Sequence, residues 1–371
     1  MTLLHFRQRL VFILLIFLPF HALIVTVVTK GILDISTHPL LAISLWKEGL
    51  IDIILTCILT ELVFKKEQRS VLFHYDIIDA LILFTTLLGI VTSMVCNVPL
   101  KQALLGFRYD FIPLLCFMIF RKARWQKEFI DTIETILLVV GLILIVYGLI
   151  TLMLPMSFFR MLGYSDLHSL YDPNGALSPF QAIEGSSWHR LQSAMSGPNQ
   201  LGTYLLISWS IALLKSRDGQ MSWGFFGAIT MIGLGILLTF SRAAWIAAII
   251  IAFVTFCRSR KHVYAFFGIA LSGIILITLL FPQSILRSAS TSDHLRKPVE
   301  ALQSIVKHPW GQGLGSAGPA SNAVSDTCVM LPSGADPSWA MAHPQLCVFV
   351  DAMQVQPRDR ACSCPTLTEN W

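Results

Sequence analysis

The sequence predicts an all-α protein: a polytopic transmembrane helix bundle with about nine spans. The chain of 371 residues is 54% hydrophobic and only 13% charged, and its mean hydropathy is +0.67. A soluble domain carries roughly 25% charged residues. Long apolar runs also recur along the chain. A chain with so few charges is solvated by lipid, which excludes the soluble enzymes as a class.

Each predicted span rests on an apolar run. A lipid-embedded helix needs about 20 mostly apolar residues, because no water reaches its backbone groups. The first run follows Arg7 and Arg9 as a signal peptide would, but it lacks a small-x-small cleavage motif and is interpreted as an uncleaved anchor. The runs are approximately 10–28, 49–64, 77–95, 103–120, 133–153, 201–214, 223–240, 243–257 and 263–281.

The basic residues orient these spans. Consecutive loops between spans fall on alternate sides of the membrane. The short loops on the same side as the N-terminus, together with the N-terminus itself, hold 14 of the 27 Lys and Arg residues. Cytoplasmic loops are rich in Lys and Arg, so the N-terminus is predicted to be cytoplasmic. The net charge of +5 follows from this topology, and no nucleic-acid partner is needed. The residues concerned are Arg7, Arg9, Lys65, Lys66, Arg69, Arg121, Lys122, Arg124, Lys127, Lys215, Arg217, Arg258, Arg260 and Lys261.

Two large segments then fall on the extracytoplasmic side. Residues 1–281 form the predicted transmembrane bundle, which includes an extracytoplasmic loop at 155–200. This loop contains Trp, Phe, Tyr and Leu with which to pack, and ordered loops of this length are usually functional. Residues 282–371 form a second extracytoplasmic region.

The second region divides into three parts. Residues 298–307 read as an amphipathic helix whose apolar face lies on the membrane surface or on the bundle. Residues 308–318 are a glycine-rich turn, and residues 323–371 are a cysteine-containing tail. Four tail cysteines in an oxidising compartment allow three disulfide pairings, whereas a zinc site would need C-x-x-C or paired His. They are Cys328, Cys347, Cys362 and Cys364.

The glycine-rich turn contains a literal G-x-G-x-x-G at 313–318. A dinucleotide site requires a strand before this motif and a helix after it. Here a predicted helix precedes the motif and Pro319 follows it. The motif therefore predicts a tight turn in which the backbone closely approaches other backbone or a ligand. It does not predict a bound cofactor.

Three arginines are the candidate functional residues. Arg242 lies between two apolar runs, where a guanidinium either snorkels to headgroups or meets a buried anion. Arg190 precedes a helix start, with a loop salt bridge as its structural alternative. Arg108 lies within a span and has Asp110 as an internal partner. The donor fork of arginine matches phosphate oxygens, so the three suit a lipid pyrophosphate at the membrane edge.

Two histidines, His189 and His308, are predicted on the same side as the arginines. Each is a candidate proton carrier near neutral pH, although such residues more often serve as structural hydrogen-bonding groups. The sequence contains neither a serine or cysteine nucleophile motif nor a cluster with metal-ligand spacing. The prediction is thus a site that uses no metal.

Several motifs resemble the O-antigen ligase/polymerase family. They are LTFSRAAW from Leu238, HRLQSAMSGPNQLGTYLL from His189, HPWGQGLGSAG from His308, LWKEGL at 45–50 and GFRYD at 106–110. The resemblance covers roughly residues 45–320, and the order and spacing of the motifs agree with the family.

This resemblance implies a metal-independent, inverting glycosyltransferase of the cell envelope. In bacterial inner-membrane proteins of this family, a glycan passes from undecaprenyl pyrophosphate to the hydroxyl of a saccharide acceptor. The positions matching Arg190 and Arg242 would hold the pyrophosphate, with Arg108, His189 and His308 as further substrate-binding candidates. The lipid bilayer is the remaining partner.

The chain departs from the family near its end. Family ligases carry His-Asn before a Tyr-Leu-Gln helix, and that His is the proposed base. The nearest match is Glu369-Asn370-Trp371, which makes Glu369 the base candidate and favours a polymerase or a divergent branch of the family over a lipopolysaccharide ligase. Residues 323–367 do not resemble the family, so an inactive, truncated member is one alternative. A flippase or transporter of lipid-linked oligosaccharides is another, although no internal repeat supports it.

Overall fold

A computed structural model of the chain describes residues 3–33, 41–64, 74–164, 178–182, 188–217, 222–256, 298–299, 301–316, 328–331, 347–350 and 353–354. The described chain is mostly helical, and it divides into two compact units. The first unit comprises residues 1–52, 125–168 and 174–294. The second comprises residues 53–124, 169–173 and 295–371.

Within the described residues, four helices are long and apolar enough to cross a membrane. They span Leu3–Ile32, Ile77–Val95, Leu100–Lys122 and Lys127–Met153, and two shorter apolar helices span Trp223–Leu238 and Arg242–Phe256. The chain is therefore a helical, membrane-associated protein. Eight of the nine apolar runs coincide with helices, while the run at 263–281 lies outside the described residues. The count of nine spans stays a prediction.

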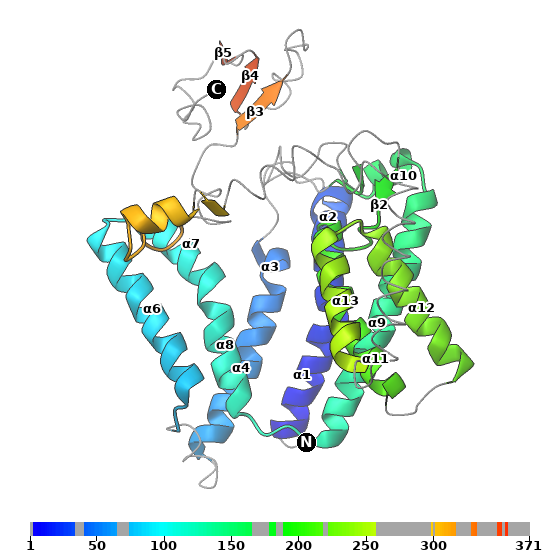
Figure 1. Cartoon of the computed structure of the whole chain (residues 1–371), viewed down its shortest axis with the longest axis horizontal. Coiled ribbons are helices and arrows are strands. Elements are labelled where there is room, and N and C mark those ends of the chain that lie inside the picture. Colours follow the sequence, from blue (N-terminus) through cyan, green and yellow to red (C-terminus); the bar gives the residue numbers. More distant parts are fainter. Residues whose placement is uncertain are drawn as a thin grey trace. The chain divides into compact units, whose positions relative to one another are not determined.

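Four helices form the core of the first unit and run side by side (Figure 1). The central helix, α11, packs on the other three. Small residues allow close approach: a Cβ added at Gly141 of α9 would lie 2.4 Å from Ser208 Oγ of α11. Such contacts are typical of membrane helices, whose association relies on close packing. The helices are α9 (Lys127–Met153), α11 (Pro198–Arg217), α12 (Trp223–Leu238) and α13 (Arg242–Phe256).

The N-terminal helical segment Leu3–Ile32 and four short elements also belong to the described part of this unit. This segment changes helix type at Pro19, because proline supplies no N–H and crowds the preceding turn. A short antiparallel hairpin precedes α11, with Gln181 opposite Arg190. The elements are α1 (Leu3–Phe17), η1 (Leu18–Phe20), α2 (His21–Thr26), η2 (Val27–Ile32), α3 (Leu41–Ser44), α10 (Met156–Met161), β1 (Gln181–Ala182) and β2 (His189–Arg190). Helix α4 (Trp46–Phe64) begins in this unit and continues in the second.

The second unit is built around α6 (Ile77–Val95), α7 (Leu100–Asp110) and α8 (Ile112–Lys122). The run predicted as one span at 103–120 lies within the single candidate span Leu100–Lys122, which is interrupted at Phe111 because Pro113 in the first turn of α8 has no N–H to extend the hydrogen-bonded ladder of α7. Asp79 near the start of α6 pairs with Lys122 at the end of α8, with Nζ and Oδ2 3.2 Å apart. These two helices are therefore antiparallel.

The last described segments of this unit include one predicted helix and one feature that was not predicted. Residues 298–299 and 301–307 are helical, within the predicted range 298–307. A three-stranded sheet in the tail departs from the all-α prediction; it comprises β3 (Cys328–Leu331), β4 (Cys347–Val350) and β5 (Met353–Gln354). Cys347 is disulfide-bonded.

Candidate functional site

Arg190 joins the long loop to the end of α12. Its side chain is buried, with 8% relative exposure. Nε donates to the Thr239 carbonyl at 2.9 Å, and Nη2 donates to Asn199 Oδ1 at 2.8 Å. Longer contacts run from Nη2 to the Phe240 carbonyl at 3.4 Å and from Nη1 to Gln181 Oε1 at 3.5 Å. The guanidinium thus satisfies carbonyls that the last turn of a helix leaves without partners.

The turn that receives Arg190 also positions Arg242. Helix α12 ends at Leu238, Phe240 adopts a left-handed φ of +49°, and α13 starts at Arg242. The Thr239 hydroxyl accepts from the Ser241 N–H at 3.3 Å, which fixes the path of the chain between the helices. Arg242 is half-buried at the first position of a 15-residue helix. Its guanidinium and the first N–H groups of α13 are donors suited to an anion.

The loop that carries Arg190 is anchored on both sides. The Leu191 N–H donates to the Leu238 carbonyl at 2.9 Å, and Ser193 Oγ donates to the Leu144 carbonyl of α9 at 2.7 Å. Gly148 makes room for the loop, since a Cβ there would lie 2.8 Å from Leu191 Cδ1. Arg190 is therefore held in one orientation by packing as well as by its own hydrogen bonds.

His189 lies on the exposed side of the same hairpin. Its ring stacks on Phe180, with centroids 4.6 Å apart, and Phe180 in turn meets Phe159 edge-on at 5.0 Å. Tyr164 packs against Phe159, and burial raises the pKa of the Tyr164 phenol, so this hydroxyl remains protonated at neutral pH. His189 therefore extends from an aromatic cluster into solvent next to Arg190.

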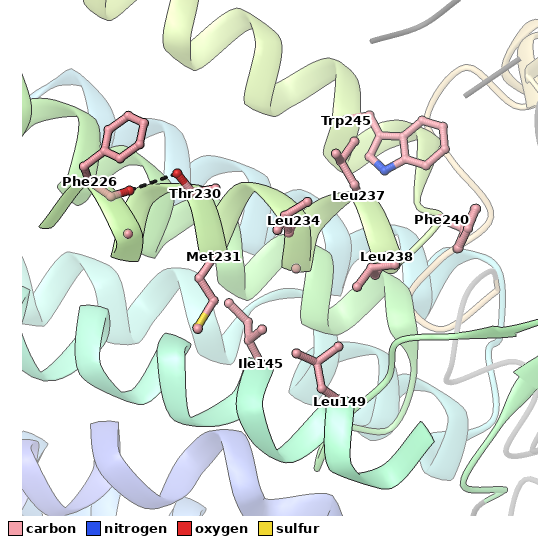
Figure 2. Close-up of a pocket in the computed structure, with 12 residues that line it drawn as sticks. Ile145, Leu149, Phe226, Thr230, Met231, Leu234, Leu237, Leu238, Phe240 and Trp245 are labelled. Atoms are coloured by element: carbon pink, nitrogen blue, oxygen red, sulfur yellow. Dashed lines mark hydrogen bonds between the residues drawn. The ribbon is translucent and has the colours of Figure 1, made fainter. Parts of the chain in front are cut away.

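An apolar groove of about 710 Å³ runs along α12 and ends at the same turn (Figure 2). Figure 2 shows Phe226 at one end and Phe240 and Trp245 at the other. The hydroxyl of the lining residue Thr230 donates to the Phe226 carbonyl at 3.0 Å, so it is engaged within its own helix. The lining residues are Ile145, Leu149, Phe226, Gly227, Thr230, Met231, Leu234, Gly235, Leu237, Leu238, Phe240 and Trp245.

The other predicted site residues do not join this cluster. Arg108 belongs to the second unit, where its guanidinium lies 5.9 Å from the Tyr109 ring centroid. His308 is exposed in the same unit, and its carbonyl accepts from the Gly311 N–H at 2.9 Å. Glu369 lies outside the described residues. The structure thus places Arg190 against the turn that precedes Arg242, and His189 on the exposed face of the same short strand as Arg190.

Two polar partners of Arg190 were not among the predicted site residues. Asn199 stands in the Ser-Gly-Pro-Asn motif after Arg190, so the motif contained a signal for it. Gln181 carried no signal, because only the antiparallel pairing of β1 with β2 places it opposite Arg190. Across the described ranges, no group of three or more His, Cys, Asp or Glu side chains is placed to hold a metal ion.

These features define the class of the molecule as a helical membrane protein with an arginine-bearing turn at the end of an apolar groove. Comparison with protein-family models, curated proteins and solved structures finds no match to this chain.

Proposed function

We propose that the chain is a membrane glycosyltransferase of the O-antigen polymerase/ligase type. It transfers a glycan from undecaprenyl pyrophosphate to a sugar hydroxyl on the periplasmic face of the bacterial inner membrane. The observation that carries the proposal is that the apolar groove ends at the turn from which Arg242 extends. A polyprenyl pyrophosphate has the same two parts, a long apolar chain and an anionic headgroup.

The two arginines have different tasks in this proposal. Arg190 acts as a positioning residue, because its guanidinium is buried and donates to Thr239, Asn199 and Phe240. Arg242 contacts the pyrophosphate directly, together with the first N–H groups of α13. This assignment refines the sequence prediction, in which both arginines held the pyrophosphate.

The chemistry follows from these placements. The acceptor hydroxyl oxygen attacks the anomeric carbon of the donor sugar as the bond from that carbon to the pyrophosphate oxygen breaks, with inversion. The electron pair leaves with the pyrophosphate, and Arg242 stabilises the charge that develops there. A base takes the hydroxyl proton, with Glu369 as the sequence-based candidate and His189, next to Arg190 in the chain, as the second candidate. No metal is assigned a role.

The proposed topology has nine spans and a cytoplasmic N-terminus. In the first unit, Arg7 lies over the Trp125 ring at 4.4 Å, and Lys215 pairs with Glu134 at 3.1 Å, which supports a shared end for three predicted cytoplasmic segments. In the second unit, the ion pair of Lys122 with Asp79 supports a shared end for the start of α6 and the end of α8. Arg190 and the turn that it contacts lie at the opposite end of α11 from Lys215, so the proposed topology assigns them to the periplasmic face.

The test combines two substitutions with one matched control. Arg242→Ala removes the proposed pyrophosphate ligand, and Leu234→Trp fills the groove at a side chain that is 53% exposed. Val254→Trp places the same indole on α13 at a side chain that is 76% exposed and outside the groove. We expect the first two variants to lose glycan transfer while remaining in the membrane, and the control to keep it.

The assay uses detergent-solubilised protein with a polyprenyl-pyrophosphate-linked oligosaccharide. A transferase lengthens the glycan without any membrane compartment, whereas a transporter of the same lipid leaves the glycan unchanged. Full activity in both Arg242→Ala and Leu234→Trp would contradict the proposal, and so would unchanged substrate with the unsubstituted chain.

A further inference from the structure

The helix at 298–307 exposes the face that its sequence makes apolar. The exposed fractions are 52% for Val299, 62% for Leu302, 57% for Ile305 and 82% for Val306. These positions share one side of a helix. The sequence predicted that this apolar face packs either on the bundle or on the membrane surface. The large exposed fractions of these four side chains exclude packing on the described part of the bundle.

The opposite side of this helix faces the chain. Ser304 is half-buried, and its Oγ accepts a hydrogen bond from Gln312 Nε2 at 3.4 Å. Gln303 and Lys307 occupy neighbouring polar positions on the helix. The helix is thus oriented with its polar side toward the glycine-rich turn and its apolar side away from it.

The glycine-rich turn fixes the helix to the ends of α6 and α7. The Leu314 N–H donates to Ser93 Oγ at 2.7 Å, and Gln102 Nε2 donates to the Gly315 carbonyl at 2.9 Å. The contact requires Gly106, because a Cβ at that position would lie 2.2 Å from the Gly315 nitrogen. Gly313 has a φ of +88°, which a residue with a side chain rarely adopts. The motif that resembled a nucleotide loop is therefore an anchor.

The anchor sets the depth of the helix. Helix α6 has 19 residues, and at about 1.5 Å per residue it is ~28 Å long, close to the hydrocarbon thickness of about 30 Å. Asp79 and Lys122 mark one end of α6, and Ser93 lies two residues before the other. Figure 1 shows the orange helix lying across this second end of α6. The anchored helix is therefore at the level of the lipid headgroups.

We propose that residues 298–307 form an interfacial helix whose partner is the bilayer itself, with the apolar face in the boundary between headgroups and acyl chains. The lipid-facing surface of α6 leads up to this level, since Met94 and Val95 are 72% and 74% exposed. Trp310 is 74% exposed beside the helix, and tryptophan favours this depth. The helix holds the following His308 at the membrane surface. This assignment is independent of the proposed glycan transfer.

The experiment compares two faces of the helix by photo-crosslinking. The full chain is reconstituted into vesicles of phosphatidylethanolamine and phosphatidylglycerol with Val306→p-benzoylphenylalanine. Lys307→p-benzoylphenylalanine is the matched control, because Lys307 is also exposed but lies on the polar side of the helix, toward Ser304. We expect the Val306 variant to form phospholipid adducts several-fold more often than the control, as measured by mass spectrometry.

Three other outcomes would contradict the interfacial assignment or test it further. Equal adduct yields at the two positions, or no lipid adduct at Val306, would overturn the assignment. A crosslink from Val306 to protein would show that a second copy or another segment covers the face. Thermal unfolding of each variant checks folding, and Leu302→p-benzoylphenylalanine repeats the test on the same face if the Val306 variant does not fold.

Discussion

Arg190 donates its Nε hydrogen to the backbone carbonyl of Thr239, a residue 49 positions further along the chain. This bond ties the loop before α11 to the last turn of α12. The same guanidinium reaches Asn199 at the start of α11, so one side chain connects three elements. The turn after α12, which carries Arg242, therefore depends on Arg190 for its shape.

The first prediction separates the two arginines by stability. Arg190→Lys replaces a planar donor fork with a single ammonium, and we expect a loss of about 1–3 kcal/mol in the free energy of unfolding. Arg242→Ala acts at a half-buried helix start, and we expect a smaller loss than for Arg190→Lys. Chemical unfolding in detergent measures both. Equal destabilisation by the two substitutions would show that Arg242 also supports the fold.

The second prediction concerns the contact of α9 with α11. Gly141→Ala places a methyl group 2.4 Å from Ser208 Oγ, which itself donates to the Leu137 carbonyl at 2.9 Å. Neither helix can move without disturbing the core, so we expect a loss of about 1–3 kcal/mol in unfolding free energy.

The control for this prediction is Gly227→Ala on α12. A Cβ at Gly227 has nothing within 4 Å, and alanine favours a helix over glycine by up to about 1 kcal/mol. We therefore expect no loss of stability or a slight gain. A matching loss in both variants would show that the alanine effect does not come from helix packing.

Much of the bundle is predictable from the sequence, because apolar runs of about 20 residues have few alternatives to helices in lipid. The span at 103–120 was predicted, but its interruption at Phe111 was not, although Pro113 is the signal for it. The sheet formed by β3, β4 and β5 was also missed, because the tail lacks long runs of alternating apolar and polar residues, which indicate strands.

The candidate site was only partly predictable. Arg190 and Arg242 stand out in the sequence as cations beside apolar runs. Their relationship does not, because it runs through main-chain carbonyls such as that of Thr239, and every residue has a carbonyl. The groove is also invisible in sequence, since its volume depends on how far α12 stands from Ile145 and Leu149 of α9.

The third prediction compares the two aspartates at the start of α6. The Asp79 and Lys122 side chains are only 5% and 9% exposed, and they are 3.2 Å apart. Asp79→Ala removes this partner, while the Lys122 ammonium keeps its hydrogen bond to the His74 carbonyl at 3.0 Å, and we expect a cost of about 1–3 kcal/mol. Asp76 is more exposed, so Asp76→Ala should cost clearly less. Chemical unfolding of both variants tests this order, and a reversed order would contradict the role of burial.

The fourth prediction is a pH dependence at Asp76. The hydrogen bond from Arg121 lowers the Asp76 pKa from 3.8 to about 2. A lowered pKa in the folded state stabilises the fold above the unfolded pKa, and this contribution is lost as pH falls through the folded value. Asp76→Asn should therefore be less stable than the unsubstituted chain at pH above about 4, with the difference disappearing toward pH 2. Thermal unfolding across this range measures it, and a pH-independent difference would exclude the carboxylate as its source.

The last prediction addresses the anchor of the glycine-rich turn. Ser93→Ala removes the oxygen that accepts from the Leu314 N–H, and we expect faster hydrogen–deuterium exchange at the Leu314 amide. Thr92→Ala is the control one residue earlier, because the Thr92 hydroxyl donates to the Leu88 carbonyl of its own helix. Exchange at Leu314 should be unchanged in that variant. Since a buried N–H left without an acceptor costs about 1–3 kcal/mol, exchange in Ser93→Ala should accelerate by roughly fivefold to 150-fold. Equal exchange in the two variants would mean that packing around Gly106, rather than the Ser93 hydroxyl, holds the turn on α6 and α7.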